Sequence, residues 1–233
     1  MKKITFILQS KGGVGKSAFA YLLANINKER PDLRIIDMDN ETNTASNQIK
    51  FIKTGKHNLI NSSTKSIDRS SFDNFFGDFI SSDYSSALCD LGATTSEQFL
   101  VFLKEAGDEI IKELVIMNVQ IQICCVIAGS NAFPASAEYC RELFKILPVD
   151  ERIKKFIIKN NYTEFTEEQV NTLTDISKKV KSTIQEFNIV SGNVPGVIKE
   201  IHALMEAGKS FDDAKVFTKI RLREAMNSIL IQV

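Results

Sequence analysis

The chain has 233 residues, of which 43% are hydrophobic and 25% are charged. This length and composition exclude a disordered tail and predict one globular domain spanning residues 1–233. Lysine plus arginine and aspartate plus glutamate both number 29, so the overall charge provides no basic surface for non-specific nucleic-acid binding, and any DNA contact must be local or indirect.

Apolar runs rich in β-branched residues alternate with segments of helical period along the chain. This alternation predicts an α/β fold with a mainly parallel, twisted sheet and helices on both faces. The expected strands are residues 3–9, 33–37, 87–90, 120–128 and 153–159, with a weaker one at 187–190. The expected helices are residues 17–28, 95–105, 135–147, 167–180, 196–207 and 211–229.

The first expected strand and helix are joined by the glycine-rich segment SKGGVGKS, residues 10–17. Glycines in such a loop allow backbone conformations closed to other residues and bring N–H groups against phosphate oxygens, at the positive end of the helix dipole. Lys16 is expected to hold the β- and γ-phosphates, and the Ser17 hydroxyl to be a magnesium ligand. The segment therefore predicts binding of ATP with Mg²⁺. The expected nucleotide-binding residues are Gly12, Gly13, Val14, Gly15, Lys16, Ser17 and Ala18.

The general phosphate-loop pattern GxxxxGK[ST] places glycine where this chain has Ser10, and a lysine, Lys11, follows. With Lys11, the loop resembles the deviant Walker A motif of the ParA/MinD family of dimerising ATPases, and the resemblance covers most of the chain. It implies that Lys11 reaches across an ATP-sandwich homodimer to the phosphates of the partner, where a cation neutralises charge on the transferred phosphoryl group. The segments LQSKGGVGKS, DMDNETNT and DLGATT are most similar to the TraL-like conjugal transfer and mobilisation branch.

Two acidic residues follow expected strands. Asp39 matches the family's switch aspartate, which orients the attacking water, although Asn40 and Glu41 replace the Pro-Gln that many members have next. An ordinary turn that caps the following helix is the alternative interpretation of Asp39. Asp90 resembles a Walker B aspartate that holds magnesium through water. Gly92 would let the adjoining switch loop respond to the γ-phosphate.

Asn160 ends the strand expected at 153–159 and matches the asparagine that contacts adenine in the family. A turn asparagine is an equally good interpretation. The two histidines, His57 and His202, have no spacing that suggests a metal or a proton relay and are expected to be structural or exposed.

Four phenylalanines recur at spacings of three and four in the polar segment 53–86: Phe72, Phe75, Phe76 and Phe79. They predict a short amphipathic helix, whose apolar stripe is more commonly used for core packing than for a partner site. Basic residues near the C-terminus are interleaved with acidic ones, which favours a solvated face over a DNA-binding patch. These residues are Lys209, Lys215, Lys219, Arg221 and Arg223.

No apolar run is long enough for export or for membrane insertion. The N-terminal run covers only residues 4–8, shorter than the apolar region of a signal peptide. No run approaches the roughly 20 apolar residues of a membrane-spanning helix, and the uncharged residues 227–233 lack the cationic flanks of an amphipathic anchor. We expect a cytoplasmic protein that does not bind membranes. Its four cysteines show no CxxC spacing and are expected to be buried, inert thiols.

The leading hypothesis is a nucleotide-switched ATPase whose homodimer closes on ATP and opens on hydrolysis, and the resemblance implies that its turnover is slow and partner-stimulated. The implied process is DNA segregation, or conjugative transfer or mobilisation of a plasmid or mobile element, with a protein partner from the corresponding complex. Two alternatives stay open: a nucleotide-gated binding module with negligible hydrolysis, and a metabolic ATP-dependent enzyme with a substrate pocket beside the γ-phosphate.

Overall fold

A computed structural model describes residues 1–39, 44–57, 68–106, 109–189 and 194–233. Its strands form one seven-stranded sheet in the order β3-β2-β4-β1-β5-β6-β7, and every neighbouring pair is parallel. The strands are β1 (Lys2–Leu8), β2 (Leu33–Met38), β3 (Thr54–Lys56), β4 (Ser86–Leu91), β5 (Val119–Ala128), β6 (Ile153–Asn160) and β7 (Thr183–Phe187). The predicted fold class is confirmed.

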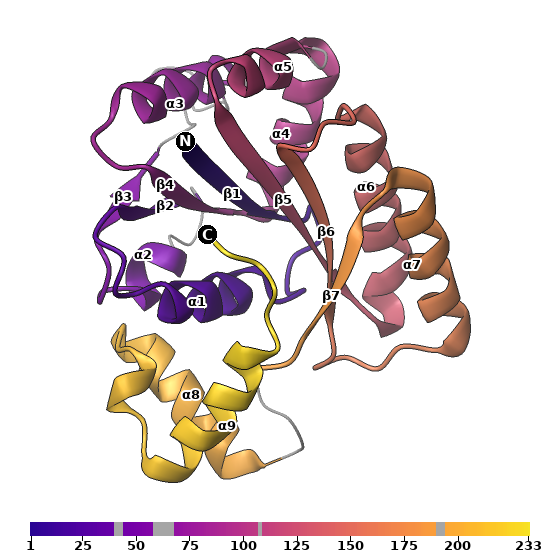
Figure 1. The fold of residues 1–233 in the computed structure, drawn as a ribbon. Helices are drawn as coiled ribbons and strands as arrows, with labels where there is room; N and C mark the ends of the chain where they lie inside the picture. Colours follow the sequence, from indigo (N-terminus) through magenta and orange to yellow (C-terminus); the bar gives the residue numbers. More distant parts are fainter. Residues whose placement is uncertain (40–43, 58–67, 107–108, 190–193) are drawn as a thin grey trace.

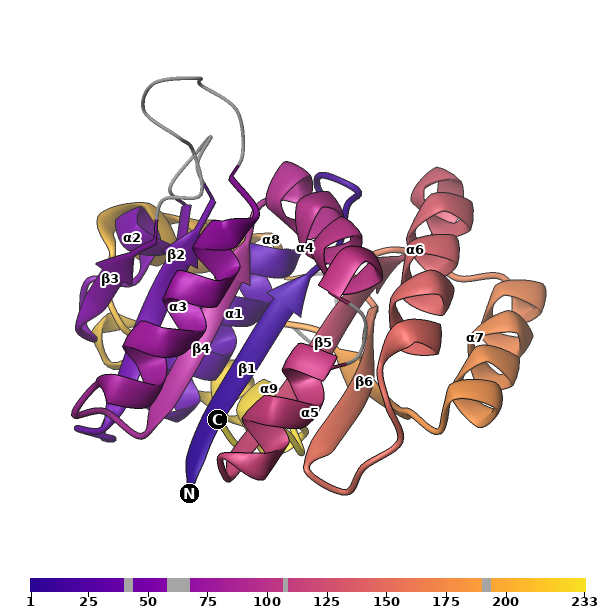
Figure 2. The same cartoon turned by 90° about the horizontal axis from the view of Figure 1, so that it is seen from above.

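Helices cover both faces of this sheet (Figures 1 and 2). The face covered by α3 to α7 and the face covered by α1, α2, α8 and α9 each bury a separate apolar core, as expected for a parallel sheet. All four cysteines are buried free thiols in these cores. The helices are α1 (Lys16–Ile26), α2 (Thr44–Gln48), α3 (Ser70–Ser81), α4 (Ala93–Ala106), α5 (Glu109–Ile116), α6 (Phe133–Ile146), α7 (Glu167–Val180), α8 (Pro195–Ala207) and α9 (Val216–Asn227). Among the described residues, no helix combines the length and apolar character needed to cross a membrane.

The phenylalanine stripe forms α3, as predicted, and packs into the core. The four rings are at most 3% exposed, and they contact aromatic residues of β1 and α4. Phe6 of β1 lies 5.0 Å from Phe99 of α4 between ring centroids, and Phe72 lies 5.2 Å from the same ring. The partner-site alternative for this stripe is therefore wrong.

The strand predicted at residues 187–190 is placed wrongly. The strand β7 ends at Phe187, where the prediction began, and Val190 lies outside the described residues. The segment TIQEF offers only two apolar residues, Ile184 and Phe187, and it pairs on one side only, with β6. An edge strand of this kind has a weak apolar signal.

The helix predicted over residues 211–229 is interrupted. A 3₁₀ turn covers Phe211–Asp213, and α9 begins three residues later. The Glu200 carboxylate of α8 accepts hydrogen bonds from the backbone N–H of Lys215 (2.6 Å) and the hydroxyl of Thr218 (2.8 Å). It thereby satisfies the backbone donor of Lys215, the N-cap of α9, which has no partner within the helix. A cap supplied by another helix leaves no local sequence signal.

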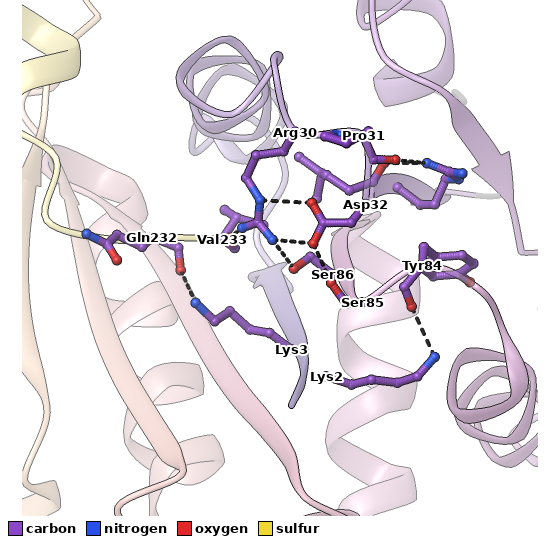
Figure 3. Close-up of polar contacts among 12 residues, drawn as sticks. Lys2, Lys3, Arg30, Pro31, Asp32, Tyr84, Ser85, Ser86, Gln232 and Val233 are labelled. Atoms are coloured by element: carbon purple, nitrogen blue, oxygen red, sulfur yellow. Dashed lines mark hydrogen bonds and ion pairs between the residues drawn. The ribbon is translucent and has the colours of Figure 1, made fainter.

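Residues 232–233 are hydrogen-bonded to residues near the amino ends of the strands (Figure 3). Arg30 donates to both carboxylate oxygens of Asp32 (3.2 and 2.7 Å) and to the carbonyl of Val233, and Lys3 donates to the carbonyl of Gln232 (3.1 Å). Hydrogen bonding to Arg30 lowers the pKa of Asp32 to about 2. This network lies at the amino ends of the strands, on the side of the sheet opposite the glycine-rich loop. It is therefore structural, and the carboxyl ends of the strands remain available for a ligand.

Candidate nucleotide-binding site

The glycine-rich loop turns directly from β1 into α1. Gly13 and Gly15 have positive φ angles of 74° and 100°, and Gly15 is the N-cap of α1. Because glycine has no side chain to cap the helix, the first N–H groups of α1 are left for an anion. Gly12 does not have a positive φ, and a Cβ there would meet nothing within 4 Å. A backbone conformation that favours glycine is therefore seen at Gly13 and Gly15 but not at Gly12.

Asn160, at the end of β6, is hydrogen-bonded to the backbone of this loop. Its side chain is 6% exposed; its Nδ2 donates to the carbonyl of Val14 (2.8 Å), and its Oδ1 accepts from the backbone N–H of Tyr162 (3.0 Å). A Cβ on Gly15 would lie 2.6 Å from the same Nδ2. Asn160 thus stabilises the loop and also lies at the predicted nucleotide site.

We expect Gly15→Ala to lower the free energy of unfolding by about 2 kcal/mol, from left-handed strain alone and before any steric term. The new methyl group would also displace Asn160 from Val14. The matched control is Gly77→Ala in α3, where a Cβ meets nothing within 4 Å; a helical glycine replaced by alanine should stabilise by roughly 0.5–1 kcal/mol. Urea denaturation measures both. Equal effects in the two variants would contradict the strained geometry of the loop.

Lys16 begins α1 and is buried, with 8% of its surface exposed. Its one hydrogen bond among the described residues is a long contact of 3.5 Å from Nζ to the carbonyl of Lys11. Burial lowers the pKa of Lys16, and the carboxylates of Asp90 and Asp39 oppose that shift. A desolvated ammonium group with so weak a partner is suited to binding an anion.

Asp90 lies near the end of β4 and is 1% exposed. Neither of its side-chain oxygens has a hydrogen-bond partner among the described residues; the Ser17 hydroxyl lies close enough to lower its pKa but lacks hydrogen-bond geometry. Burial is the largest effect and raises the pKa of Asp90 to about 7, against the opposing influence of Ser17 and Lys16. A buried carboxylate without a partner, beside a hydroxyl group, fits a divalent cation that shares its remaining positions with phosphate and water. The described residues contain no cluster of three or more His, Cys, Asp or Glu side chains that could hold a metal ion alone.

The segment after β2 brings Asp39 to the same site. Asp37 accepts a hydrogen bond from the backbone N–H of Asp39 (3.0 Å) at Oδ1, and from that of Ser46 in α2 (2.7 Å) at Oδ2. The first aspartate therefore fixes the backbone of the second. Gly92, just beyond β4, packs against Asp39, because a Cβ on this glycine would lie 2.7 Å from Asp39 Oδ1. The predicted departure at Asn40 and Glu41 lies outside the described residues.

Two adjoining cavities follow the loop and share Gly13, Gly15 and Ala18. The larger, about 410 Å³, adjoins the phosphate loop and Asp39 and extends beyond them to Thr44, Gln48, Gly92, Ala93 and Met205. The smaller, about 130 Å³, is mainly apolar and is lined in addition by Asn160, Tyr162, Phe187, Ile189, Ile198, Ile201 and His202. A cavity lined by the phosphate loop, Lys16 and Asp39, beside a mainly apolar one, matches the phosphates and the base of a nucleotide.

The apolar wall has only a weak signal in the sequence. The proline-led segment 194–208, which contains α8, resembles the ParA/MinD segment that passes near the base, whereas Phe187 and Ile189 are far from the loop in sequence and share no motif with it. His202, expected to be structural or exposed, is exposed and also lines this cavity. Lys11 is exposed at the surface of the loop.

Comparison with family models and with characterised proteins gave no match. Solved structures do match over nearly the whole chain. A ParA family ATPase from Chlorobium tepidum has a TM-score of 0.54 at 13% identity and covers 97% of this chain and 98% of its own. The MinC:MinD complex of Aquifex aeolicus gives 0.55 at 12% identity, covering 100% and 98%. A nucleotide-binding protein from Archaeoglobus fulgidus, in complex with ADP, gives 0.51 at 15% identity, covering 94% and 91%.

The chain therefore has the fold of the ParA/MinD P-loop nucleoside triphosphatases. At these identities the likeness concerns the fold alone. The particular activity has to be argued from the residues of the site.

Proposed function

We propose that this protein is an ATPase of the ParA/MinD type that binds ATP with Mg²⁺. The observation that carries the proposal is Asp90: a fully buried carboxylate without a hydrogen-bond partner in the described part of the chain, placed beside Ser17 and Lys16 at the phosphate loop. Such a group costs folding free energy unless a ligand compensates it. A magnesium ion and the phosphates of ATP provide that compensation.

Each predicted site residue has a role in this proposal. The N–H groups of residues 12–18 and the Lys16 ammonium bind the phosphates, and the apolar cavity beside Asn160 receives the adenine. Ser17 and Asp90 would hold Mg²⁺. When bound, the ion neutralises charge on the phosphates. Asp39 orients the attacking water, and its backbone is fixed for that task by Asp37.

The proposal includes an ATP-dependent homodimer. Lys11 is exposed beside the phosphate cavity, so its side chain is available to a second subunit, whose phosphates it would contact. Hydrolysis is slow and partner-stimulated, in a cytoplasmic single domain of residues 1–233. The process is DNA segregation, or conjugative transfer and mobilisation of the TraL-like type, with a protein partner of that complex.

One observation favours the metabolic alternative. The larger cavity extends past the loop to Thr44 and Gln48, which leaves space for a second substrate beside the γ-phosphate. A binding module with negligible hydrolysis is the other alternative. Phosphate release from the purified protein, with and without DNA, separates these functions: DNA-stimulated release supports the proposal, no release supports the module, and release that depends on a small-molecule acceptor supports the enzyme.

The dimer is tested with two alanine substitutions. Lys11→Ala should abolish ATP-dependent dimerisation in analytical ultracentrifugation while monomer affinity stays within about threefold, a change of less than about 1 kcal/mol. Asp39→Ala should retain the ATP dimer and lose at least about 100-fold in kcat, since the attacking water is no longer oriented. An unchanged dimer in the first variant would remove the sandwich from the proposal, and normal turnover in the second would remove Asp39 from the mechanism.

A further inference from the structure

Gln9, the residue between β1 and the phosphate loop, is fully buried and bonded to three parts of the fold. Its side-chain Nε2 donates to the carbonyl of Val126 in β5 (3.1 Å) and to that of Ser136 in α6 (3.0 Å). Its Oε1 lies 3.4 Å from both the Ser10 hydroxyl and the backbone N–H of Lys11. The amide therefore anchors the first residues of the loop to the core.

The backbone of Gln9 is bonded to the start of α4. Its N–H donates to the Ser96 hydroxyl (3.1 Å), and that hydroxyl donates to the carbonyl of Gly92 (2.8 Å). Ser96 is fully buried, and its own carbonyl accepts a hydrogen bond from the hydroxyl of Tyr139 in α6 (2.7 Å). Ser96 is thus held on both sides and connects β4 to β1.

This chain of hydrogen bonds runs between two functional residues. At one end Gly92 packs against Asp39, with no space for a Cβ between them; at the other end Gln9 contacts the backbone of Lys11. We propose that Gln9 and Ser96 are positioning residues that couple the place of Asp39 to that of Lys11. The coupling rests on the proposed function, in which Asp39 faces the γ-phosphate and Lys11 faces the partner subunit.

The two 3.4 Å contacts of Gln9 Oε1 are the part of this hydrogen-bond chain that a movement of the loop can change. They are longer than an ordinary hydrogen bond of about 2.7–3.2 Å, so a small movement of the loop makes or breaks them. The bonds of Nε2 to the carbonyls of Val126 and Ser136 are of ordinary length and, with a further contact to Cys125 Sγ (3.6 Å), hold the amide in place. A shift of Gly92 moves Ser96 and the Gln9 backbone, and with them the start of the loop.

A purely structural role for a buried amide is the alternative, and Gln122 supplies the control. Gln122 in β5 is also buried, at 6% exposed, and its Oε1 accepts from the Thr5 hydroxyl (3.1 Å). None of its hydrogen bonds in the described part of the chain reaches the loop. Gln9→Leu and Gln122→Leu therefore remove the same group just after β1 and from the neighbouring β5, with different predicted consequences for the loop.

The first test uses the nucleotide-free protein and does not depend on the proposed function. In hydrogen–deuterium exchange, Gln9→Leu should accelerate exchange of the Lys11 amide, whose N–H contacts Gln9 Oε1, about tenfold. Ser96→Ala should do the same although Ser96 does not touch Lys11, and Gln122→Leu should leave this amide unchanged. If Ser96→Ala alters only the amides of α4, or if Gln122→Leu alters the loop equally, the coupling is wrong.

The second test uses ATP and separates nucleotide binding from dimerisation and turnover. Gln9→Leu and Ser96→Ala should leave the ATP affinity of the monomer within about threefold, since Lys16 is retained, and should weaken ATP-dependent dimerisation and kcat about tenfold, equivalent to about 1.4 kcal/mol. The double variant should lose no more than either single one. Additive losses would overturn the coupling. A wild-type protein that neither dimerises nor hydrolyses ATP would refute the proposed function while leaving the exchange result to judge Gln9.

Discussion

Replacing Lys16 by glutamine is expected to weaken ATP binding at least about 100-fold, or roughly 3 kcal/mol. The ammonium is buried, and its one hydrogen bond in the described structure is the long contact to the Lys11 carbonyl. Charge-assisted hydrogen bonds to phosphate are worth about 1.5–3 kcal/mol each, and a buried cation that serves two phosphates makes more than one. Calorimetric titration with ATP and Mg²⁺ measures the loss directly.

Lys11→Gln is the matched control, with the same change of charge five residues earlier in the same loop. Lys11 is exposed, so its removal should change the ATP affinity of the monomer by no more than about threefold. Thermal unfolding without nucleotide guards against a trivial explanation, because removing a desolvated charge from position 16 should not destabilise the fold. Equal ATP affinity in Lys16→Gln and wild type would invalidate the phosphate site.

Those elements of the fold whose signal is local could be predicted from the sequence. The strands β1, β2, β4, β5 and β6 each contain a short apolar run between turn signals, and α3 shows its phenylalanine stripe. The short elements β3, α2 and α5 were not predicted, and a strand of three residues carries almost no periodic signal. The start of α9 is capped by Glu200, which approaches from another helix. Contacts of that kind are set by tertiary packing.

The same distinction applies to the site. Gly15, Lys16, Asp39 and Asp90 could be predicted because each lies at the carboxyl end of a strand or in a motif of fixed spacing, and parallel pairing brings such ends together. The apolar wall was indicated only in part: the segment 194–208, which contains α8, resembles a family segment near the base, whereas no pattern in the sequence relates Phe187 and Ile189 to the loop. Gln9 carried no signal either, since its importance lies in partners contributed by separate elements.

Asp90→Asn should stabilise the protein free of nucleotide and magnesium, by an amount that depends on pH. The folded-state pKa of Asp90 is about 7, raised mainly by burial, whereas an aspartate in an unfolded chain has a pKa of about 4. The folded protein therefore binds this proton more tightly than the unfolded chain, and stability falls as pH rises from about 4 to about 7. A difference of about three between the two pKa values corresponds to roughly 4 kcal/mol. The free energy of unfolding of Asp90→Asn should exceed that of the wild type by up to about 4 kcal/mol at pH 8 and by almost nothing at pH 4.

Urea denaturation at pH 4, 6 and 8 measures the difference in free energy of unfolding between wild type and Asp90→Asn. The other titrating groups are common to both proteins, so their contributions cancel in this difference. The control is Asp83→Asn, an exposed aspartate just before β4, which should stay within about 0.5 kcal/mol of wild type at every pH. Magnesium with ATP should stabilise the wild type strongly at pH 8 and the Asp90→Asn variant far less, because the ion replaces the missing partner of the carboxylate. A stability difference that does not change with pH would show that Asp90 is not a buried, uncompensated acid, and the strongest support for a magnesium nucleotide at this site would be lost.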